Sequence, residues 1–272
     1  MAAVTALPSD ETRLDLDRRE AACRALALSA GQLASRAFAE RGASGAVSLK
    51  GPQDFLTETD AAVEQHLRTG LAAAFPDDGF LGEEGGGVLK DRVWVVDPID
   101  GTANFARAIP HFCISIAFVA AGRIELGAIC NPSTAELYFA RRGRGATRNG
   151  MPIHVAATSD YRAACVELGW STRVPNADYV GALSRILDRG ANVRRAASGA
   201  LGLAYVADGR SDAYAELHMH PWDCLAGLLL VEEAGGIVAP FLELGGLEHG
   251  GAVLAATPAI AGGISEVTGI AL

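Results

Sequence analysis

The chain has 272 residues, half of them hydrophobic, which is enough to bury a sizeable core as one large domain or as two packed halves. Its formal net charge of −9 argues against a nucleic-acid duplex as the main partner, because binding many phosphates needs a basic face. Five scattered cysteines, without the close spacing of a zinc or redox site, predict a reducing, cytoplasmic compartment.

Charged residues crowd the start of the chain, a composition that fits neither a signal peptide nor a transit peptide. From Glu11 to Glu40 apolar residues recur at helical spacing, which predicts a long first helix. The glycines between Gly42 and Gly45 break this pattern, and Val47–Leu49 is a candidate for a brief strand. A second helix should follow and end at Pro76, with these apolar residues on one side: Leu56, Val63, Leu67, Leu71 and Ala74.

A glycine-rich loop is expected from Gly82 to Gly87. After it, the continuous apolar run Val93–Val96 is typical of a buried strand, and Asp97 stands where that strand should end. The most apolar stretch, Ile109 to Ala121, is too short to cross a bilayer and is interrupted by His111. We therefore expect a soluble protein without a membrane partner.

The remainder of the chain mixes strand and helix patterns, which favours sheets layered between helices. Strands are expected at Cys113–Val119, Ile124–Cys130, Glu136–Ala140, Ala164–Leu168 and Ser211–Ala215. Helices are expected at Asp178–Asp188, Gly199–Ala207, Trp222–Ala234 and Pro258–Val267. Turn residues near 149–152 predict a boundary between two halves, residues 1–150 and residues 151–272.

The hexamer Asp-Pro-Ile-Asp-Gly-Thr at residues 97–102 carries the strongest chemical signal. Its proline stiffens the turn, so Asp97 and Asp100 can leave the strand close together. Hard divalent cations resolve the repulsion between two carboxylates, and magnesium suits such oxygen ligands best. Gly101 and Thr102 follow, where backbone N–H groups can approach a phosphate. The alternative is an ordinary Asp turn with a helix cap.

Three other acidic places can complete a metal site. Glu83 and Glu84 lie in the glycine-rich loop, where a solvated surface pair is the alternative. Asp60 falls early in the second helix, where a favourable position on the helix dipole is the alternative. Asp223 opens an apolar helix, where helix capping is the alternative. Only the combination of these residues favours a site.

That combination resembles the inositol monophosphatase family, whose pattern is Gly-Glu-Glu, then Asp-Pro-Ile-Asp-Gly-Thr, then Trp-Asp far downstream. Here the motifs occur in that order at residues 82–84, 97–102 and 222–223, and the likeness runs from about residue 50 to about residue 260. The resemblance implies an α/β (α+β) fold, a layered α/β/α/β/α sandwich of the inositol monophosphatase and fructose-bisphosphatase type. It also implies a homodimer.

The resemblance implies a metal-ligand set when it is carried over position by position. Glu83, Asp97 and the Ile99 carbonyl would hold one Mg²⁺. Asp97, Asp100 and Asp223 would hold a second, and a third, looser ion would share Glu83. Mn²⁺ is an alternative to Mg²⁺. On this reading residues 1–150 carry most of the ligands, and residues 151–272 contribute Asp223 and the substrate side.

The catalytic roles are also implied by the resemblance. In the family an Asp and Thr pair orients and deprotonates the attacking water, and the matching residues are Asp60 and Thr102, with Glu83 beside the metals. Gly101 and Thr102 would bind the phosphate, and no covalent phosphoenzyme is implied. The next threonine of the family pattern is here Ala103, which removes one hydroxyl from the substrate side and leaves the backbone donors.

Two further positions match the family differently. Glu216 falls where inositol-specific members keep a glutamate that accepts hydrogen bonds from ring hydroxyls, which favours a cyclic polyol phosphate. An exposed charge at a strand end is the alternative. Lys50 resembles a family lysine, but the loop after it is one residue shorter, so we do not place it in the site.

Two groups of basic residues are interpreted as structural. His218 and His220 alternate with Met219, and we expect them to face opposite sides of a strand or bend and not to chelate one ion easily. Arg141, Arg142 and Arg144 lie beside glycine turns and are interpreted as a solvated hairpin tip or a subunit contact.

The motifs together predict Mg²⁺-dependent hydrolysis of a small phosphate monoester, with inositol monophosphate as the first substrate. Histidinol-phosphate phosphatase, fructose-1,6-bisphosphatase and adenosine 3′,5′-bisphosphate phosphatase share the metal core and stay open as alternatives. A non-enzymatic metal- or ligand-binding regulator is a further alternative, although such a protein would not need Asp60 and Thr102. An aspartyl-phosphate mechanism normally uses two aspartates separated by one residue, whereas two residues separate Asp97 from Asp100.

Overall fold

The computed structural model describes residues 10–40, 47–51 and 54–272. In the first half of the chain the elements are α1 (Asp10–Glu40), β1 (Val47–Gly51), β2 (Asp54–Thr57), α2 (Glu58–Ala74), β3 (Gly79–Gly82), β4 (Gly86–Val88), β5 (Arg92–Asp100), α3 (Thr102–Ala106), β6 (Cys113–Ala120), β7 (Arg123–Asn131), β8 (Glu136–Arg141), β9 (Ala146–Arg148) and β10 (Met151–Pro152). In the second half they are a 3-10 turn (Tyr161–Ala163), β11 (Cys165–Leu168), α4 (Asn176–Asp188), β12 (Asn192–Arg194), α5 (Gly199–Ala207), β13 (Ala213–Met219), α6 (Pro221–Glu233), β14 (Ile237–Val238), α7 (Gly246–His249), β15 (Gly251–Ala256) and α8 (Pro258–Thr268).

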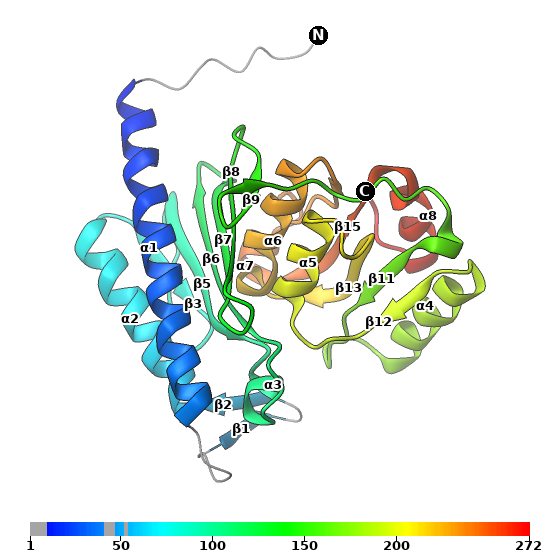
Figure 1. The fold of residues 1–272 in the computed structure, drawn as a ribbon, viewed down its shortest axis with the longest axis horizontal. Coiled ribbons are helices and arrows are strands. Elements are labelled where there is room, and N and C mark those ends of the chain that lie inside the picture. Colours follow the sequence, from blue (N-terminus) through cyan, green and yellow to red (C-terminus); the bar gives the residue numbers. More distant parts are fainter. Residues whose placement is uncertain (1–9, 41–46, 52–53) are drawn as a thin grey trace.

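Two large sheets alternate with three layers of helices (Figure 1). The first sheet has eight strands in the order β10-β9-β8-β7-β6-β5-β3-β4, and the second has five in the order β12-β11-β13-β15-β14. Helices α1 and α2 cover the outer face of the first sheet, α5 and α6 fill the space between the sheets, and α4 and α8 cover the far face of the second. The layered α/β/α/β/α fold that the resemblance implied is confirmed.

Strand β5 shows how the first sheet contributes to two cores. Val93 and Val95 pack toward the middle helices, whereas Trp94 and Val96 pack toward α1 and α2. The strand therefore reads as a continuous apolar run, as expected for a strand that is covered on both faces. Because side chains alternate along a strand, Asp97 continues the inner row and points toward the middle layer.

The middle layer is the most deeply buried part of the molecule. Residues 224–231 of α6 are all buried. They pack with the inner face of the first sheet and with Tyr214, Val253 and Ala255 of the second sheet. A helix that is apolar on every side suits this position, because both of its faces meet a sheet. The end of β5 and the first turn of α6 are thereby brought together.

Several predicted boundaries are wrong. Leu56 belongs to β2 rather than to the second helix, which begins at Glu58 because Thr57 and Asp60 form a capping box there. The glycine-rich loop is largely a hairpin, in which β3 pairs with β4. Asp97 lies inside β5, since the pairing with β6 continues through a β-bulge to Asp100.

The interpretation of the basic cluster after β8 as a solvated tip is wrong for Arg141 and Arg142, whereas Arg144 is exposed. The subunit contact stays a prediction. Arg141 is only 7% exposed and pairs with Asp17 and Glu20 of α1. Arg142 pairs with Glu232 of α6 at 3.0 Å. These contacts tie the hairpin between β8 and β9 to two helical layers.

Among the described residues, no helix combines the length and the apolar composition that crossing a bilayer would need. The glycines at 42–45, which we expected to break the first helix, lie outside the described residues. The division of the chain at residue 150 stays a prediction.

Candidate active site

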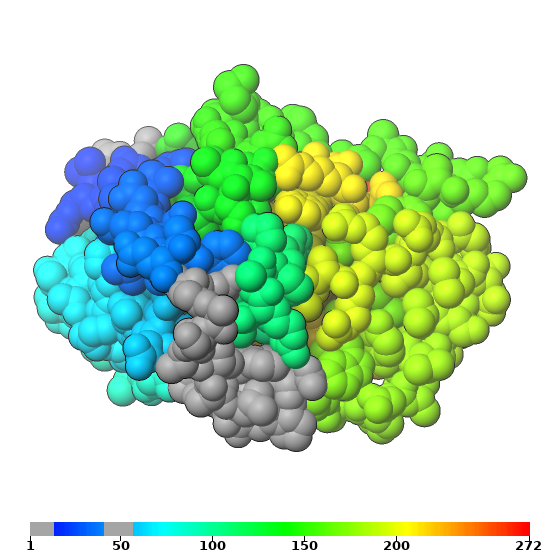
Figure 2. Space-filling model, turned by 60° about the horizontal axis from the view of Figure 1, so that its bottom comes forward, coloured from blue at the N-terminus to red at the C-terminus, as the bar shows by residue number. Residues whose placement is uncertain are grey.

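A cleft of about 490 Å³ opens where the two sheets approach each other beside the end of β5. Its lining comes from the start of α3, the loops after β11 and β12, the end of β13 and the first turn of α6. In Figure 2 the teal segment around α3 faces the yellow segment around residue 195 across a crevice. Segments that are distant in the sequence therefore share one cavity.

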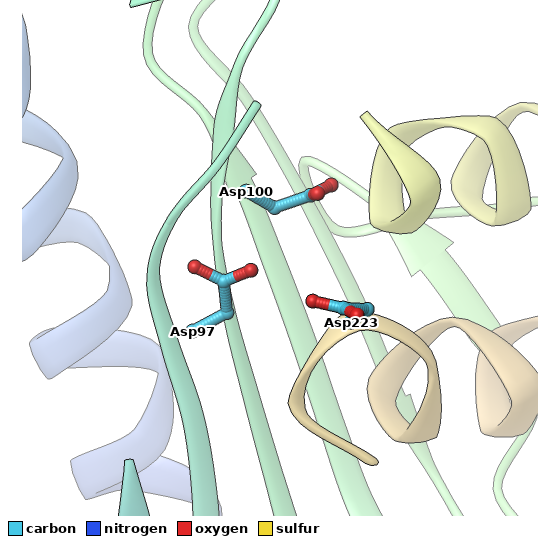
Figure 3. Close-up of side chains that lie close together, drawn as sticks. All are labelled: Asp97, Asp100 and Asp223. Carbon is cyan, nitrogen blue, oxygen red and sulfur yellow. The ribbon is translucent and has the colours of Figure 1, made fainter. Parts of the chain in front are cut away.

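Three aspartates meet beside this cleft (Figure 3). The nearest carboxylate oxygens of Asp97, Asp100 and Asp223 all lie within 4.8 Å of one another. Asp97 and Asp100 are 1% and 8% exposed, and Asp223 is partly exposed. In the part of the chain that the structure describes, none of the three forms an ion pair with a basic side chain. The three carboxylates therefore lie close together, and no basic side chain of the described residues neutralises their charge.

Hydrogen bonds hold the first two aspartates in place. The Ile99 N–H donates to Oδ1 of Asp97 at 2.9 Å. Asp100 accepts from the Ser198 hydroxyl at 2.6 Å and from the Ala200 N–H at 2.8 Å. Since these donors lie at the start of α5, Asp100 occupies the position of a capping anion and joins β5 to the middle helices.

Asp223 reaches the cluster from the opposite side, in the first turn of α6. The His220 N–H donates to its Oδ2 at 3.1 Å, which closes a capping box. In Figure 3 the carboxylate still points toward Asp97 and Asp100. Helix capping, which was the alternative to a role in the site, is therefore compatible with that role.

Electrostatics favours a cation at this cluster. Burial raises the pKa of Asp97 well above its ordinary value, and the charges of Glu83, Asp100 and Asp223 raise it further. Burial is also the main cause that raises the pKa values of Asp100 and Asp223. A divalent cation would compensate this repulsion, and an all-oxygen ligand set fits a hard cation such as Mg²⁺.

Glu83 approaches the same cluster from the hairpin of β3 and β4. Its backbone N–H donates to the Val96 carbonyl at 3.2 Å, which fixes the hairpin against β5. After burial, its charge is the largest cause of the raised pKa of Asp97. The structure thus brings together Glu83 and the three aspartates that the motifs singled out.

One residue that positions the hairpin was missed from the sequence. Glu64 of α2 is 4% exposed, and its carboxylate accepts the N–H groups of Glu84 at 2.8 Å and Gly85 at 2.9 Å. Arg68 donates to Glu64 at 2.8 Å and to a carbonyl of the hairpin at 3.0 Å. The available signal was spacing, because Asp60, Glu64 and Arg68 recur every four residues and share one helix face.

Asp60 and Thr102 lie in direct contact. The Thr57 N–H donates to Oδ2 of Asp60 at 2.9 Å, and the Thr57 hydroxyl contacts the same oxygen. The Thr102 hydroxyl lies 3.1 Å from Oδ1 of Asp60 and 2.8 Å from the Ile99 carbonyl oxygen. A hydroxyl has one proton, so it donates to one of these acceptors at a time. Burial raises the pKa of Asp60, which makes its carboxylate a stronger base.

Gly101 forms the turn between β5 and α3. Its φ is +96°, and an added Cβ would come within 3.0 Å of the His111 carbonyl oxygen. Only glycine adopts this backbone in such a tight place at little cost. Gly101, Thr102 and Ala103 all line the cleft, so the segment expected to bind phosphate faces it.

Glu216 lines the cleft from β13, next to Asp223. The Tyr214 hydroxyl donates to its Oε2 at 2.6 Å. Burial is the largest effect on this carboxyl group and raises its pKa to about 7. The residue is therefore a half-buried acceptor inside the cleft, and the alternative of an exposed charge at a strand end is wrong.

We expected His218 and His220 to face opposite sides of the strand, and this prediction is wrong. Both His218 and His220 line the cleft, and their ring centroids are 5.7 Å apart. The expectation misapplied strand alternation, because residues two apart in a strand lie on the same face. His220 also stacks on Trp222 with centroids 4.5 Å apart.

The wall opposite the aspartates was missed from the sequence. We call it the far wall, and it consists of Trp170, Arg173, Arg194 and Arg195. Trp170 and Arg173 follow β11, Arg194 ends β12 and Arg195 follows it. No motif links these two segments, which only folding brings together. Lys50, which we did not place in the site, lies in β1, and its side chain is outside the described part of the structure.

Comparisons with known proteins agree with this geometry. The sequence pattern described as the inositol monophosphatase family matches residues 15–266. "Nus factor SuhB" of Pseudomonas aeruginosa is 40% identical over 224 residues, covering 79% of this chain and 82% of that protein. "Inositol-1-monophosphatase" of Rhizobium meliloti is 43% identical over 195 residues, covering 70% and 73%. The crystal structure of extragenic suppressor protein suhB from Bartonella henselae superposes with a TM-score of 0.84 at 32% identity, covering 91% and 96%.

Proposed function

Because this chain belongs to the inositol monophosphatase family, a family of metal-dependent phosphatases, we propose that it hydrolyses a small phosphate monoester, with inositol monophosphate as the first candidate. One observation carries the proposal: Asp60 and Thr102 are in contact beside a buried cluster of carboxylates. A protein that only bound an anion would need neither the base nor the hydroxyl that orients a water.

The contacts of Asp60 define its role in the proposed mechanism. The Thr57 N–H holds one carboxylate oxygen, so the other is left to interact with Thr102. A water that donates to the Thr102 oxygen lets the Thr102 hydroxyl donate to Asp60 in turn. The proton then moves from the water toward Asp60, and the oxygen that remains attacks the phosphorus while the P–O bond to the alcohol breaks. The alkoxide that leaves takes a proton from solvent, so inorganic phosphate and the free alcohol are the products. No side chain is assigned as a nucleophile, so no phosphoenzyme is formed.

The aspartate cluster supplies the metal ligands in this proposal. Asp97, Glu83 and the Ile99 carbonyl would hold one cation, and Asp97, Asp100 and Asp223 would hold a second. Two or three Mg²⁺ ions, with Mn²⁺ as an alternative, would neutralise these carboxylates, polarise the phosphate and lower the pKa of a water. Gly101 and Thr102 would present backbone N–H groups to the phosphate.

Glu216 supports a polyol as the alcohol part of the substrate. Its carboxylate is held by Tyr214 and faces the cleft, where it can accept hydrogen bonds from hydroxyl groups. Ala103 lines the same cleft and lacks the hydroxyl of the family pattern. The name of the Rhizobium relative, inositol-1-monophosphatase, points to the same class of substrate. Histidinol phosphate, fructose 1,6-bisphosphate and adenosine 3′,5′-bisphosphate remain alternatives on the same metal core.

A second candidate function comes from the names of several relatives. Proteins called Nus factor SuhB are 38% to 41% identical to this chain. The alternative is therefore that this chain serves as a Nus factor and hydrolyses nothing. The contact between Asp60 and Thr102 favours hydrolysis, and loss of that contact without loss of cellular function would favour the alternative.

We also propose a homodimer in a reducing, cytoplasmic compartment, with neither a nucleic acid nor a membrane as main partner. All five cysteines are free, which fits reducing surroundings. The acidic net charge of −9 fits a small phosphorylated ligand better than a polyanion.

Phosphate release tests the proposed function. The panel is inositol 1-phosphate, histidinol phosphate, fructose 1,6-bisphosphate and adenosine 3′,5′-bisphosphate, each with Mg²⁺ and with EDTA. We expect release that depends on Mg²⁺ and is fastest with inositol 1-phosphate. Absence of release from all four compounds would contradict the proposal, and a trapped phosphoenzyme would contradict the mechanism.

A further inference from the structure

We propose that Arg173 and Arg195 of the far wall form a subsite for a second anionic group on the substrate, such as the second phosphate of a bisphosphorylated polyol. The inference rests on the proposed phosphatase function, which accounts for the first phosphate at the aspartate cluster. It assigns selectivity for a second anionic group to two residues that none of the motifs contains.

The two arginines act on the Glu216 carboxyl group through their charges but form no ion pair with it in the described part of the chain. Arg194, their neighbour, pairs with Glu167 at 2.9 Å. Within the described part of the chain neither Arg173 nor Arg195 forms an ion pair, and both are exposed. Elsewhere, arginines such as Arg210 pair with glutamates. In a protein with a net charge of −9, two cations without an ion pair at one cleft indicate a negatively charged ligand.

The two arginines lie near Glu216, the residue proposed to contact the alcohol part of the substrate. Arg173 and Arg195 line the same cavity as Glu216. Their positive charges act on the Glu216 carboxyl group and oppose the effect of burial on its pKa. A substrate whose hydroxyl groups contact Glu216 would therefore bring a further substituent toward the two guanidinium groups.

The guanidinium of Arg195 is partly oriented before any ligand arrives. It lies 5.5 Å from the ring centroid of Trp170, within the range of a cation–π contact. The indole N–H of Trp170 donates to Asn176 at 2.9 Å, which holds the ring in place. An aromatic ring orients a guanidinium without neutralising it, so the charge and its forked donors remain available to a phosphate.

The size of the cleft agrees with a substrate larger than a single phosphate. Cavities of about 300 to 1,000 Å³ hold drug-sized ligands, and this cleft measures about 490 Å³. A ring with one phosphate at the aspartates and a second at the far wall fits that range. A monophosphate would leave both arginines without a partner.

The test compares inositol 1-phosphate with inositol 1,3-, 1,4- and 1,5-bisphosphate, using the full-length protein with Mg²⁺. We expect kcat/KM to be about tenfold higher for the best bisphosphate at low salt, because one hydrogen bond to a charged group contributes at least enough free energy for about that factor. In the double variant Arg173→Gln with Arg195→Gln this ratio should fall to about one. High salt should also lower the ratio of bisphosphate to monophosphate kcat/KM for the wild type, because salt screens the charges of exposed arginines.

Arg123→Gln is the matched control, because Arg123 is also exposed and its substitution removes one positive charge away from the cleft. That variant should keep the wild-type ratio. Equilibrium binding of the same compounds, measured by calorimetry with Ca²⁺ in place of Mg²⁺, gives the ratio without turnover. Absence of turnover would therefore count against the proposed function, whereas an unchanged binding ratio would count against the arginine subsite.

Two results would overturn the subsite. One is a wild-type protein that neither binds nor hydrolyses any bisphosphate better than the monophosphate. The other is a double variant that keeps the wild-type ratio. If that variant also changes the molecular mass measured by light scattering, the arginines serve a contact between two copies instead.

Discussion

Asp60, Asp97 and Asp100, which we call the near wall although only Asp100 lines the cleft itself, differ in environment from Arg173 and Arg195 of the far wall. Each carboxylate of the near wall is buried and receives at least one hydrogen bond from a backbone N–H group. The arginines of the far wall are exposed, and Arg195 is oriented by one aromatic contact.

This difference separates two tasks. Catalytic groups must keep their positions while charge develops in the transition state, because their reorganisation during the reaction would slow it. Selection among substrates tolerates flexible, solvated charges, because it depends on differences in binding. We therefore expect substitutions on the near wall to change kcat most, and substitutions on the far wall to change the preference among substrates.

The largest effect is expected for Asp60→Asn. Asparagine can still accept from the Thr57 N–H, so the start of α2 should be retained while the base is lost. We predict that kcat falls by about a thousandfold with little change in Mg²⁺ affinity. Phosphate release and Mg²⁺ calorimetry measure the two quantities. The exposed Asp91→Asn is the control, and an Asp60→Asn variant with wild-type kcat would mean that Asp60 is not the base.

A substitution between the walls should change stability instead. The Asn104 side chain is 7% exposed and donates to the carbonyls of His111 and Ala196, both at 2.8 Å, which ties α3 to the loop before α5. Asn104→Ala leaves buried acceptors unsatisfied and should lower the free energy of unfolding by about 2 kcal/mol. Urea denaturation measures this loss, with the exposed Asn192→Ala as control. An unchanged midpoint would show that the two walls do not depend on this amide.

Glu64→Gln tests whether the near wall depends on residues behind it. The glutamine cannot accept the Glu84 and Gly85 N–H groups with two equivalent oxygens, so the hairpin that carries Glu83 should loosen. We predict an apparent Mg²⁺ affinity about tenfold weaker, with kcat largely recovered at saturating Mg²⁺. Glu58→Gln, an exposed change in the first turn of the same helix, is the control. Equal Mg²⁺ dependence of the two variants would contradict a positioning role.

The smallest effect is expected from the protonation of Glu216. Its pKa of about 7 in the folded protein lies above the ordinary value of 4.5, so folding favours the protonated form. The stabilisation is fully present below about pH 4.5 and is lost as the pH rises through about 7. Between pH 5 and pH 8, in EDTA, the wild type should lose about 1 kcal/mol more stability than Glu216→Gln. Identical pH profiles of thermal unfolding for the two proteins would contradict this account.

How much of the site could be predicted from the sequence also differs between the walls. Residues 97–102 could be predicted because the motif is contiguous and follows an apolar strand. Asp60 and Asp223 could be predicted only through their combination with the other motifs and the resemblance to the family, because each alone is explained equally well by its place at the start of a helix. The far wall could not, because Arg173 and Arg195 follow strands whose parallel pairing brings separate loops together only in the folded chain.

The same contrast holds for the fold. Strand β5 was recognised because both of its faces are apolar, but its continuation to Asp100 depends on pairing with β6, which a local pattern cannot reveal. Strand β15 at residues 251–256 was missed because glycine and alanine give it a weak strand signal. Its place beside β13 is determined by tertiary contacts.

The central claim is that the aspartate cluster binds divalent cations and that hydrolysis depends on them. Its most direct test is a calorimetric titration of Mg²⁺ into the wild type and into Asp97→Asn, with phosphate release from inositol 1-phosphate measured on the same samples. We predict that the wild type binds Mg²⁺ and releases phosphate, whereas Asp97→Asn stays folded by circular dichroism and loses both. An Asp97→Asn variant that hydrolyses the substrate at the wild-type rate would contradict the account.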